Sequence, residues 1–173
     1  MVVAVSLCGC GGSPTTSSQP KDGESMLNAL RSRIDQLGGQ DAYPVVPLDL
    51  FFGGNQDEAS FAPNLVPHPG MATIYDVLRA IRDRPEVSDV VVQIDEVLDG
   101  DEWPFAPAVY VITKADAQDV YQWAEATGPD PYDPSDVTSH YGWLEYAGRT
   151  RATPPPGAPE VPDGHRVVIL YWD

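Results

Sequence analysis

Apolar residues recur along this chain at two different spacings, and the order in which the two patterns alternate limits the fold more than any other feature. The three- and four-residue spacing of a helix with one buried face occurs in three segments, residues 24–37, 73–84 and 116–126. Branched and aromatic residues, in part alternating with polar ones, fill four strand-like segments, residues 45–52, 87–97, 108–113 and 165–172. We therefore predict a single α+β domain over residues 24–173.

After the first helix, the order of these segments is strand, helix, strand, strand, helix, strand. This order is typical of the ferredoxin-like split β-α-β arrangement, in which two helices cover one face of a four-stranded antiparallel sheet. In that arrangement the last strand lies beside the first. We expect this βαββαβ two-layer sandwich with an extra N-terminal helix, and an antiparallel sheet of different strand order is the alternative.

Individual residues suggest where the elements begin and end. Thr73, with Asp76 three residues later, fits a capping box at the start of the second helix. Asp116 fits the N-cap of the third helix, and Gly128 fits its C-terminal end. Residues 129–164 are rich in Pro, Asp, Gly and Ser and have no core pattern, so we predict a long Pro-rich connection there.

Both cysteines lie within the first ten residues, so no disulfide can brace the domain. A short apolar run precedes them, and an uncharged stretch rich in Gly, Ser, Pro and Thr follows. In this setting Leu7-Cys8-Gly9-Cys10 resembles the lipobox of bacterial lipoproteins, which is Leu, a short residue, Gly or Ala, then Cys. The resemblance implies cleavage after Gly9 and a lipid on Cys10.

On that resemblance, residues 1–9 are the remnant of a signal peptide, residues 10–23 are a disordered tether, and the domain lies outside the cytoplasmic membrane. The membrane is then a partner through the acyl chains on Cys10, where each buried methylene contributes about 0.8 kcal/mol. The residues alone leave two alternatives: a disordered tail with incidental cysteines, and a weak Cys-x-Cys metal pair.

The chain is strongly acidic, with 26 Asp and Glu against 10 Lys and Arg and a net charge of -16. Such a surface repels phosphate backbones, which excludes non-specific nucleic-acid binding. Between Pro85 and Asp136 there are 13 acidic residues and one base, Lys114, so most of the charge lies there. Because such a field accelerates association with positive molecules, a basic protein is the partner we expect.

Two loops contain candidate binding residues. Residues 95–102 hold five carboxylates, among them Asp99, Asp101 and Glu102, but their spacing lacks the closing Glu of an EF-hand loop. A solvated loop tip is therefore the simpler interpretation. Asn55 and Asp57 follow a Gly-rich turn, where they either bind a sugar or a cation or hydrogen-bond their own backbone.

Aromatic residues gather in the second half of the chain. Trp103 follows the acidic loop, and Tyr141 and Trp143 lie in the Pro-rich connection. Exposed Trp and Tyr dominate interface energies, so these three are candidates for contacting a partner. The alternative is that they hold the two long loops against the sheet.

The sequence contains no recognisable catalytic or metal-binding motif, and we expect no cofactor, no metal and no catalytic residue. His68, His140 and His165 are widely separated, and none belongs to a known hydrolase pattern. A pocket joining His140 or His68 to two carboxylates would favour an enzyme.

We expect a non-enzymatic, lipid-anchored extracytoplasmic domain that binds a protein or cell-envelope component through its acidic, aromatic-bearing loops. One alternative is an immunity-like inhibitor of a basic toxin or enzyme. Another is a small envelope hydrolase or calcium-binding protein.

Overall fold

The computed structural model describes residues 22–135, 140–145, 149–151 and 153–172. The α-helices are α1 (Asp22–Gln36), α2 (Leu48–Phe52), α3 (Met71–Arg82) and α4 (Ala117–Ala124). The strands are β1 (Val45–Pro47), β2 (Val87–Gln93), β3 (Ala108–Thr113), β4 (Trp143–Glu145), β5 (Arg149–Arg151) and β6 (Arg166–Tyr171). Short 3-10 helices are η1 (Gln40–Ala42), η2 (Glu58–Ser60) and η3 (Glu125–Thr127). The fold is therefore α+β, as predicted. Within the described residues, no helix has the length and apolar character needed to cross a membrane.

The main sheet has the order β1-β2-β3-β6, and every neighbouring pair is antiparallel. This order does not confirm the ferredoxin-like arrangement, because β6 pairs with β3 and lies at the opposite edge from β1. A ferredoxin-like sheet needs a first strand with a neighbour on each side. Here β1 has only three residues, and on its open side Val45 N–H donates to the Pro156 carbonyl at 2.9 Å. The Pro-rich segment therefore covers the edge where the last strand was expected.

The predicted strand over residues 45–52 is wrong in its second half. Leu48, Phe51 and Phe52 are buried at the three- and four-residue spacing of a helix, and they form α2. Pro47 precedes the first residue of α2, where its missing N–H costs nothing to the helix. Asp49 on α2 accepts hydrogen bonds from Tyr75 and Arg82 of α3, both at 2.8 Å, which ties the two helices together.

The predicted capping box at Thr73 is also wrong. Helix α3 begins at Met71, because Met71 is itself buried in line with Ile74, Leu78 and Ile81. Gly70 takes the N-cap position with a φ of 87°, which is accessible to glycine. Helix α4 does begin after Asp116, but the Asp116 carboxylate makes no cap and instead accepts from Arg166 at 2.7 Å.

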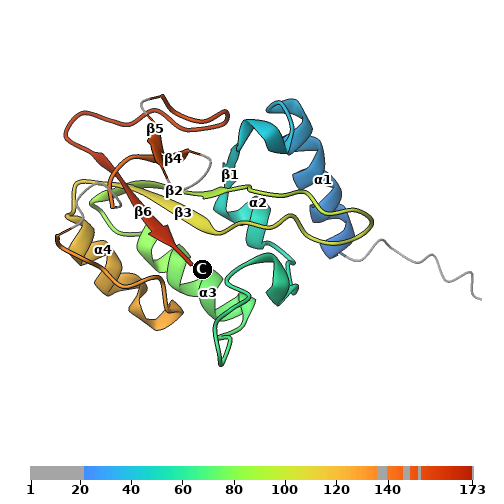
Figure 1. The fold of residues 1–173 in the computed structure, drawn as a ribbon, viewed down its shortest axis with the longest axis horizontal. Helices are drawn as coiled ribbons and strands as arrows, with labels where there is room; N and C mark the ends of the chain where they lie inside the picture. Colours follow the sequence, from blue (N-terminus) through green and yellow to red (C-terminus); the bar gives the residue numbers. More distant parts are fainter. Residues whose placement is uncertain (1–21, 136–139, 146–148, 152, 173) are drawn as a thin grey trace, which may run out of the picture.

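The Pro-rich connection contains secondary structure that the sequence pattern did not indicate. Strands β4 and β5 pair as an antiparallel hairpin. Figure 1 shows this hairpin and the following loop on one side of the sheet, with α3 and α4 on the other. The connection is thus a covering layer.

Both faces of the sheet are buried. On the helical face, Val90, Val92, Val109 and Val111 join the apolar sides of all four α-helices. On the other face, Val91, Tyr110 and Ile112 pack with Trp143 and residues of β6. The alternation predicted for the last strand is confirmed, since Val167 and Ile169 belong to the second cluster and Val168, Leu170 and Trp172 to the first.

Trp172, next to the end of β6, packs against the helical layer. Replacing it tests how much this contact stabilises the fold. Its ring lies 4.8 Å from that of Phe61, and its indole N–H donates to Thr127 O at 3.0 Å. We expect Trp172→Ala to lower the free energy of unfolding by about 3–5 kcal/mol, measured by urea titration. Val66→Ala is the control, because Val66 is 94% exposed and should change stability by less than about 0.5 kcal/mol. Similar losses of unfolding free energy in the two variants would contradict a stabilising role for the contacts of Trp172.

Candidate functional site

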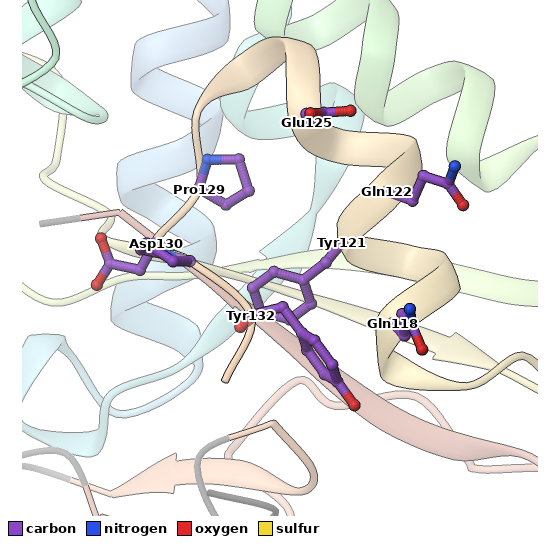
Figure 2. A pocket seen from close by; sticks show the side chains of 8 residues that line it. Gln118, Tyr121, Gln122, Glu125, Pro129, Asp130 and Tyr132 are labelled. Carbon is purple, nitrogen blue, oxygen red and sulfur yellow. The ribbon is translucent and has the colours of Figure 1, made fainter. Parts of the chain in front are cut away.

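A hollow of about 440 Å³ lies beside α4, between that helix and the chain that follows it (Figure 2). We call it the α4 pocket. Its lining consists of Gln118, Tyr121, Gln122, Glu125, Pro129, Asp130, Pro131 and Tyr132. These eight residues include two carboxylates, two amides and two phenol rings, and none of them is Lys or Arg.

The local sequence explains why these groups meet. Gln118, Gln122 and Glu125 follow one another at four and three residues, so they share one exposed face of the helix. Gly128 then takes the left-handed conformation that ends η3 and turns the chain back. Asp130 N–H donates to the Tyr171 carbonyl at 2.8 Å, which fixes the returning segment to β6.

An aromatic trio, Tyr121, Tyr132 and His140, forms and supports the wall of the pocket. The ring centroids of Tyr121 and Tyr132 are 5.4 Å apart, with the planes inclined by 54°. His140 is only 3% exposed and lies 5.2 Å from Tyr121 and 4.6 Å from Tyr132, centroid to centroid. The imidazole therefore supports both phenol rings from inside the protein.

The hydrogen bonds of His140 define its role. Its Nε2 lies 2.7 Å from the Asp133 carbonyl, which can only accept, so Nε2 carries a proton. In the neutral ring Nδ1 is then an acceptor, and the Tyr121 hydroxyl donates to it at 3.3 Å. Burial, together with smaller effects of the Asp130 charge and the neighbouring Tyr132, raises the pKa of Tyr121 to about 12. Tyr121 thus stays a neutral donor at physiological pH.

The chemistry available in the α4 pocket is that of binding a polar or positive group. Phenol rings offer their negative faces to a cation, and carboxylate and amide oxygens accept its N–H groups. His140 is not part of the lining, and both of its ring nitrogens have hydrogen-bond partners. His68 Nε2 bonds the Phe61 carbonyl at 3.0 Å, and its Nδ1 accepts from Gly70 N–H at 3.0 Å. Both histidines are thus engaged by the protein's own groups, and His68 Nδ1 also lies 3.6 Å from Glu58 Oε1.

The acidic loop occupies a different place. Helix α1 holds it through Arg31, whose guanidinium donates to the carbonyls of Leu98 at 2.9 Å and Glu102 at 2.8 Å. In Figure 1 this loop extends beside α1, at the end of the molecule away from α4. The side chains of Asp99, Asp101 and Glu102 are exposed there.

The carboxylates of this loop do not converge. Among the residues that the structure describes, no group of three or more His, Cys, Asp or Glu is arranged to hold a metal ion. Burial raises the pKa of Asp95, and the adjacent charge of Glu96 raises it further. The predicted loop residues are therefore a spread negative surface.

Asn55 and Asp57 form a turn network. Asn55 is 5% exposed; its amide donates to Ser60 Oγ at 2.9 Å and its carbonyl oxygen accepts from Asp57 N–H at 2.9 Å. Asp57 in turn accepts from Ala59 N–H at 3.0 Å and caps η2. These contacts match the alternative in which the residues hydrogen-bond their own loop.

The aromatic candidates lie mostly inside the protein. Trp103 is 7% exposed and packs edge-on against Phe51, and Trp143 is 5% exposed and packs edge-on against Tyr110. Tyr141 is half-buried, and its hydroxyl accepts from Ala117 N–H at 3.1 Å. Both tryptophans hold their loops against the sheet, and neither indole offers a broad face to a partner. Cys10 lies outside the described residues.

Sequence reasoning did not identify the α4 pocket. The signal available was the helical face of Gln118, Tyr121, Gln122 and Glu125 followed by Pro-Asp-Pro-Tyr at residues 129–132. A helix face beside a proline-stiffened turn is common, so the pattern gains meaning only when the turn folds back onto the helix.

Replacing Tyr121 with Phe tests the link between the pocket wall and His140. The change keeps the ring but removes the hydroxyl, so we expect a loss of about 1 kcal/mol in the free energy of unfolding at neutral pH. Because the pKa of Tyr121 is about 12 in the folded state and 10.0 is its ordinary value, the native state binds more protons between these values. Unfolding free energy therefore falls as pH rises through that window, and the variant should show a smaller fall. Equal slopes in parent and variant would contradict the burial of this hydroxyl.

Comparison with known proteins places the chain in a family. Residues 25–170 match the family described as "Uncharacterized protein YfbO family". The Uncharacterized protein YfbO of Escherichia coli (strain K12) is 31% identical over 132 residues, which cover 75% of this chain and 83% of the relative. No solved structure matches the chain. Since the family match spans nearly all of the described domain, the chain belongs to the YfbO family.

Proposed function

We propose that this protein is a non-enzymatic binding domain, held outside the cytoplasmic membrane by a lipid on Cys10, that recognises a basic protein partner. The observation that carries the proposal is the α4 pocket, which combines Glu125 and Asp130 with the rings of Tyr121 and Tyr132 and has no cationic lining residue. The net charge of -16 supports the same class of partner.

The two acidic regions then have different roles. The exposed carboxylates of the loop at residues 95–102 add to a long-range field that speeds encounter, an effect that salt screens. The α4 pocket acts at contact distance, where aromatic rings and desolvated carboxylates determine how long a complex lasts. An immunity-like role, in which the domain covers a basic toxin or enzyme, is a special case of this proposal.

Paired charge variants separate the two regions. We expect Glu125→Gln/Asp130→Asn to lose capture of the partner in a pull-down from crosslinked cell envelopes. Asp99→Asn/Asp101→Asn removes the same charge from the acidic loop and should retain most of it. The captured protein should be basic, and raising salt from about 0.05 to 0.5 M should weaken binding by both the parent and the loop variant. An acidic partner, or equal capture by both double variants, would overturn the proposal.

Lipid anchoring is tested at the cysteine itself. In native cells the Cys10→Ala variant should move from the detergent phase to the aqueous phase, because it cannot carry the thioether-linked acyl chains. Cys8→Ala is the matched control and should stay in the detergent phase. Mass analysis of the parent should show a processed chain that begins with lipidated Cys10. An unmodified and unprocessed chain would remove the proposed placement.

A further inference from the structure

We propose that the α4 pocket recognises an arginine side chain of the partner and prefers a guanidinium to an ammonium group. This inference rests on the proposed function, and it names the chemical group that the same site recognises. Three features of the pocket lead to it: the angle between the two phenol rings, the arrangement of acceptors, and the rigidity of the wall.

The two rings offer a planar cation unequal surfaces, because Tyr132 is half-buried whereas Tyr121 is only 9% exposed. Tyr121 and Tyr132 are inclined by 54° with centroids 5.4 Å apart, so together they form an angled wall and not a flat stack. Figure 2 shows both rings in the centre of the site, between the α4 side chains and the segment that carries Asp130. A guanidinium can stack on one ring while its edge meets the other, whereas an ammonium has no planar face to stack.

The acceptors come from both segments that border the pocket. Gln118, Gln122 and Glu125 line the side formed by α4, and Asp130 lies on the opposite segment. A guanidinium carries five N–H donors in one plane, which suits acceptors that approach from several sides. An ammonium has three donors and is more strongly hydrated, so it loses more when it leaves water.

The wall is fixed before any ligand arrives. His140 contacts both rings and accepts a hydrogen bond from the Tyr121 hydroxyl, and the Asp133 carbonyl holds the imidazole in turn. Asp130 is tied to β6 through its backbone N–H. A preformed site avoids the entropy cost of ordering side chains on binding, which matters most for a single side chain as ligand.

The protein uses the same chemistry elsewhere in its own fold. Arg84 lies over the ring of Trp123 on α4, with its guanidinium carbon 4.0 Å from the centroid. Arg166 lies over Tyr141 at 5.7 Å while its Nη1 meets the Asp116 carboxylate at 2.7 Å. The second contact pairs a tyrosine ring with an aspartate around one guanidinium, which is the combination that the α4 pocket presents to a partner.

Three short peptides that differ in one residue test the inference. The probes are acetyl-Gly-Arg-Gly-amide, its Lys counterpart and its citrulline counterpart, which keeps the shape of arginine without the charge. Binding is followed by NMR through the side-chain amides of Gln118 and Gln122. We expect the Arg peptide to bind about threefold to tenfold more tightly than the Lys peptide, and the citrulline peptide to bind more weakly than either.

Variants assign the effect to the pocket. Tyr132→Leu keeps an apolar side chain without the ring and should reduce the Arg preference to about one. Glu125→Gln, at an exposed position, should weaken both cationic peptides by about threefold or more. Glu102→Gln removes an equal charge from the acidic loop and should change neither. The backbone amide spectrum of each variant checks that the fold is intact, and Glu125→Gln keeps the test decisive if Tyr132→Leu unfolds.

The outcomes separate this inference from the proposed function. Equal affinity for the Arg and Lys peptides, both sensitive to Glu125→Gln, would overturn the arginine preference while leaving a basic partner in place. No shift with either cationic peptide, together with an envelope pull-down that is insensitive to the pocket variants, would overturn both. Shifts caused by N-acetylglucosamine and not by the Arg peptide would overturn the inference in favour of a glycan site.

Discussion

Burial of both faces of the central sheet is the constraint on which the rest of the structure depends. All six residues of β3 are buried, and this strand pairs with β2 on one side and β6 on the other. A strand of this kind needs a cover on each face, because apolar area left in water costs roughly 25 cal/mol per Å². The helices supply one cover, and the hairpin of β4 and β5 with the following Pro-rich segment supplies the other. The long connection is therefore a structural layer of the domain.

The parts of the fold that follow from local pattern were predictable, and the parts set by long-range contacts were not. Helix α1, strand β3 and the alternation of β6 depend on apolar spacing within a few residues, and each appears close to its predicted bounds. The conversion of residues 48–52 into helix and the early start of α3 depend on which side chains find the core. The cover on the open edge of β1 depends on a contact between distant residues, Val45 N–H to the Pro156 carbonyl, and on Gly157 next to it. A Cβ at Gly157 would collide with the Val45 carbonyl oxygen, so this approach requires glycine, but no spacing rule in the sequence reveals it.

The same difference between local pattern and long-range contacts explains why the sequence did not reveal the α4 pocket. Composition draws attention to acids and aromatics in the second half of the chain, yet it does not distinguish an aromatic residue that fills the core from one that lines a pocket. Trp103 and Trp143 were the more conspicuous candidates, and their size is the reason they are buried, since a large apolar ring gains most by leaving water. The less conspicuous tyrosines on α4 and the following turn differ from them, since Tyr132 is only half-buried and Tyr121, although 9% exposed, still lines the pocket. The turn at Gly128 and the bond from Asp130 N–H to the Tyr171 carbonyl bring them together, and His140, from a segment that the sequence pattern left without structure, packs against both rings.

The burial of His140 also affects the chemistry available in the α4 pocket. A general acid or base must reach the substrate and exchange its proton during the reaction, which requires an accessible nitrogen. His140 instead contacts the protein through both nitrogens and sits behind the tyrosine rings, so its contribution is to hold their angle. In the proposed function, rings held at a fixed angle beside carboxylates select a ligand by shape and charge. The contacts of His140 with Tyr121 and Tyr132 therefore make the wall of the α4 pocket rigid, and this rigidity is the property on which the proposed preference for a planar cation depends.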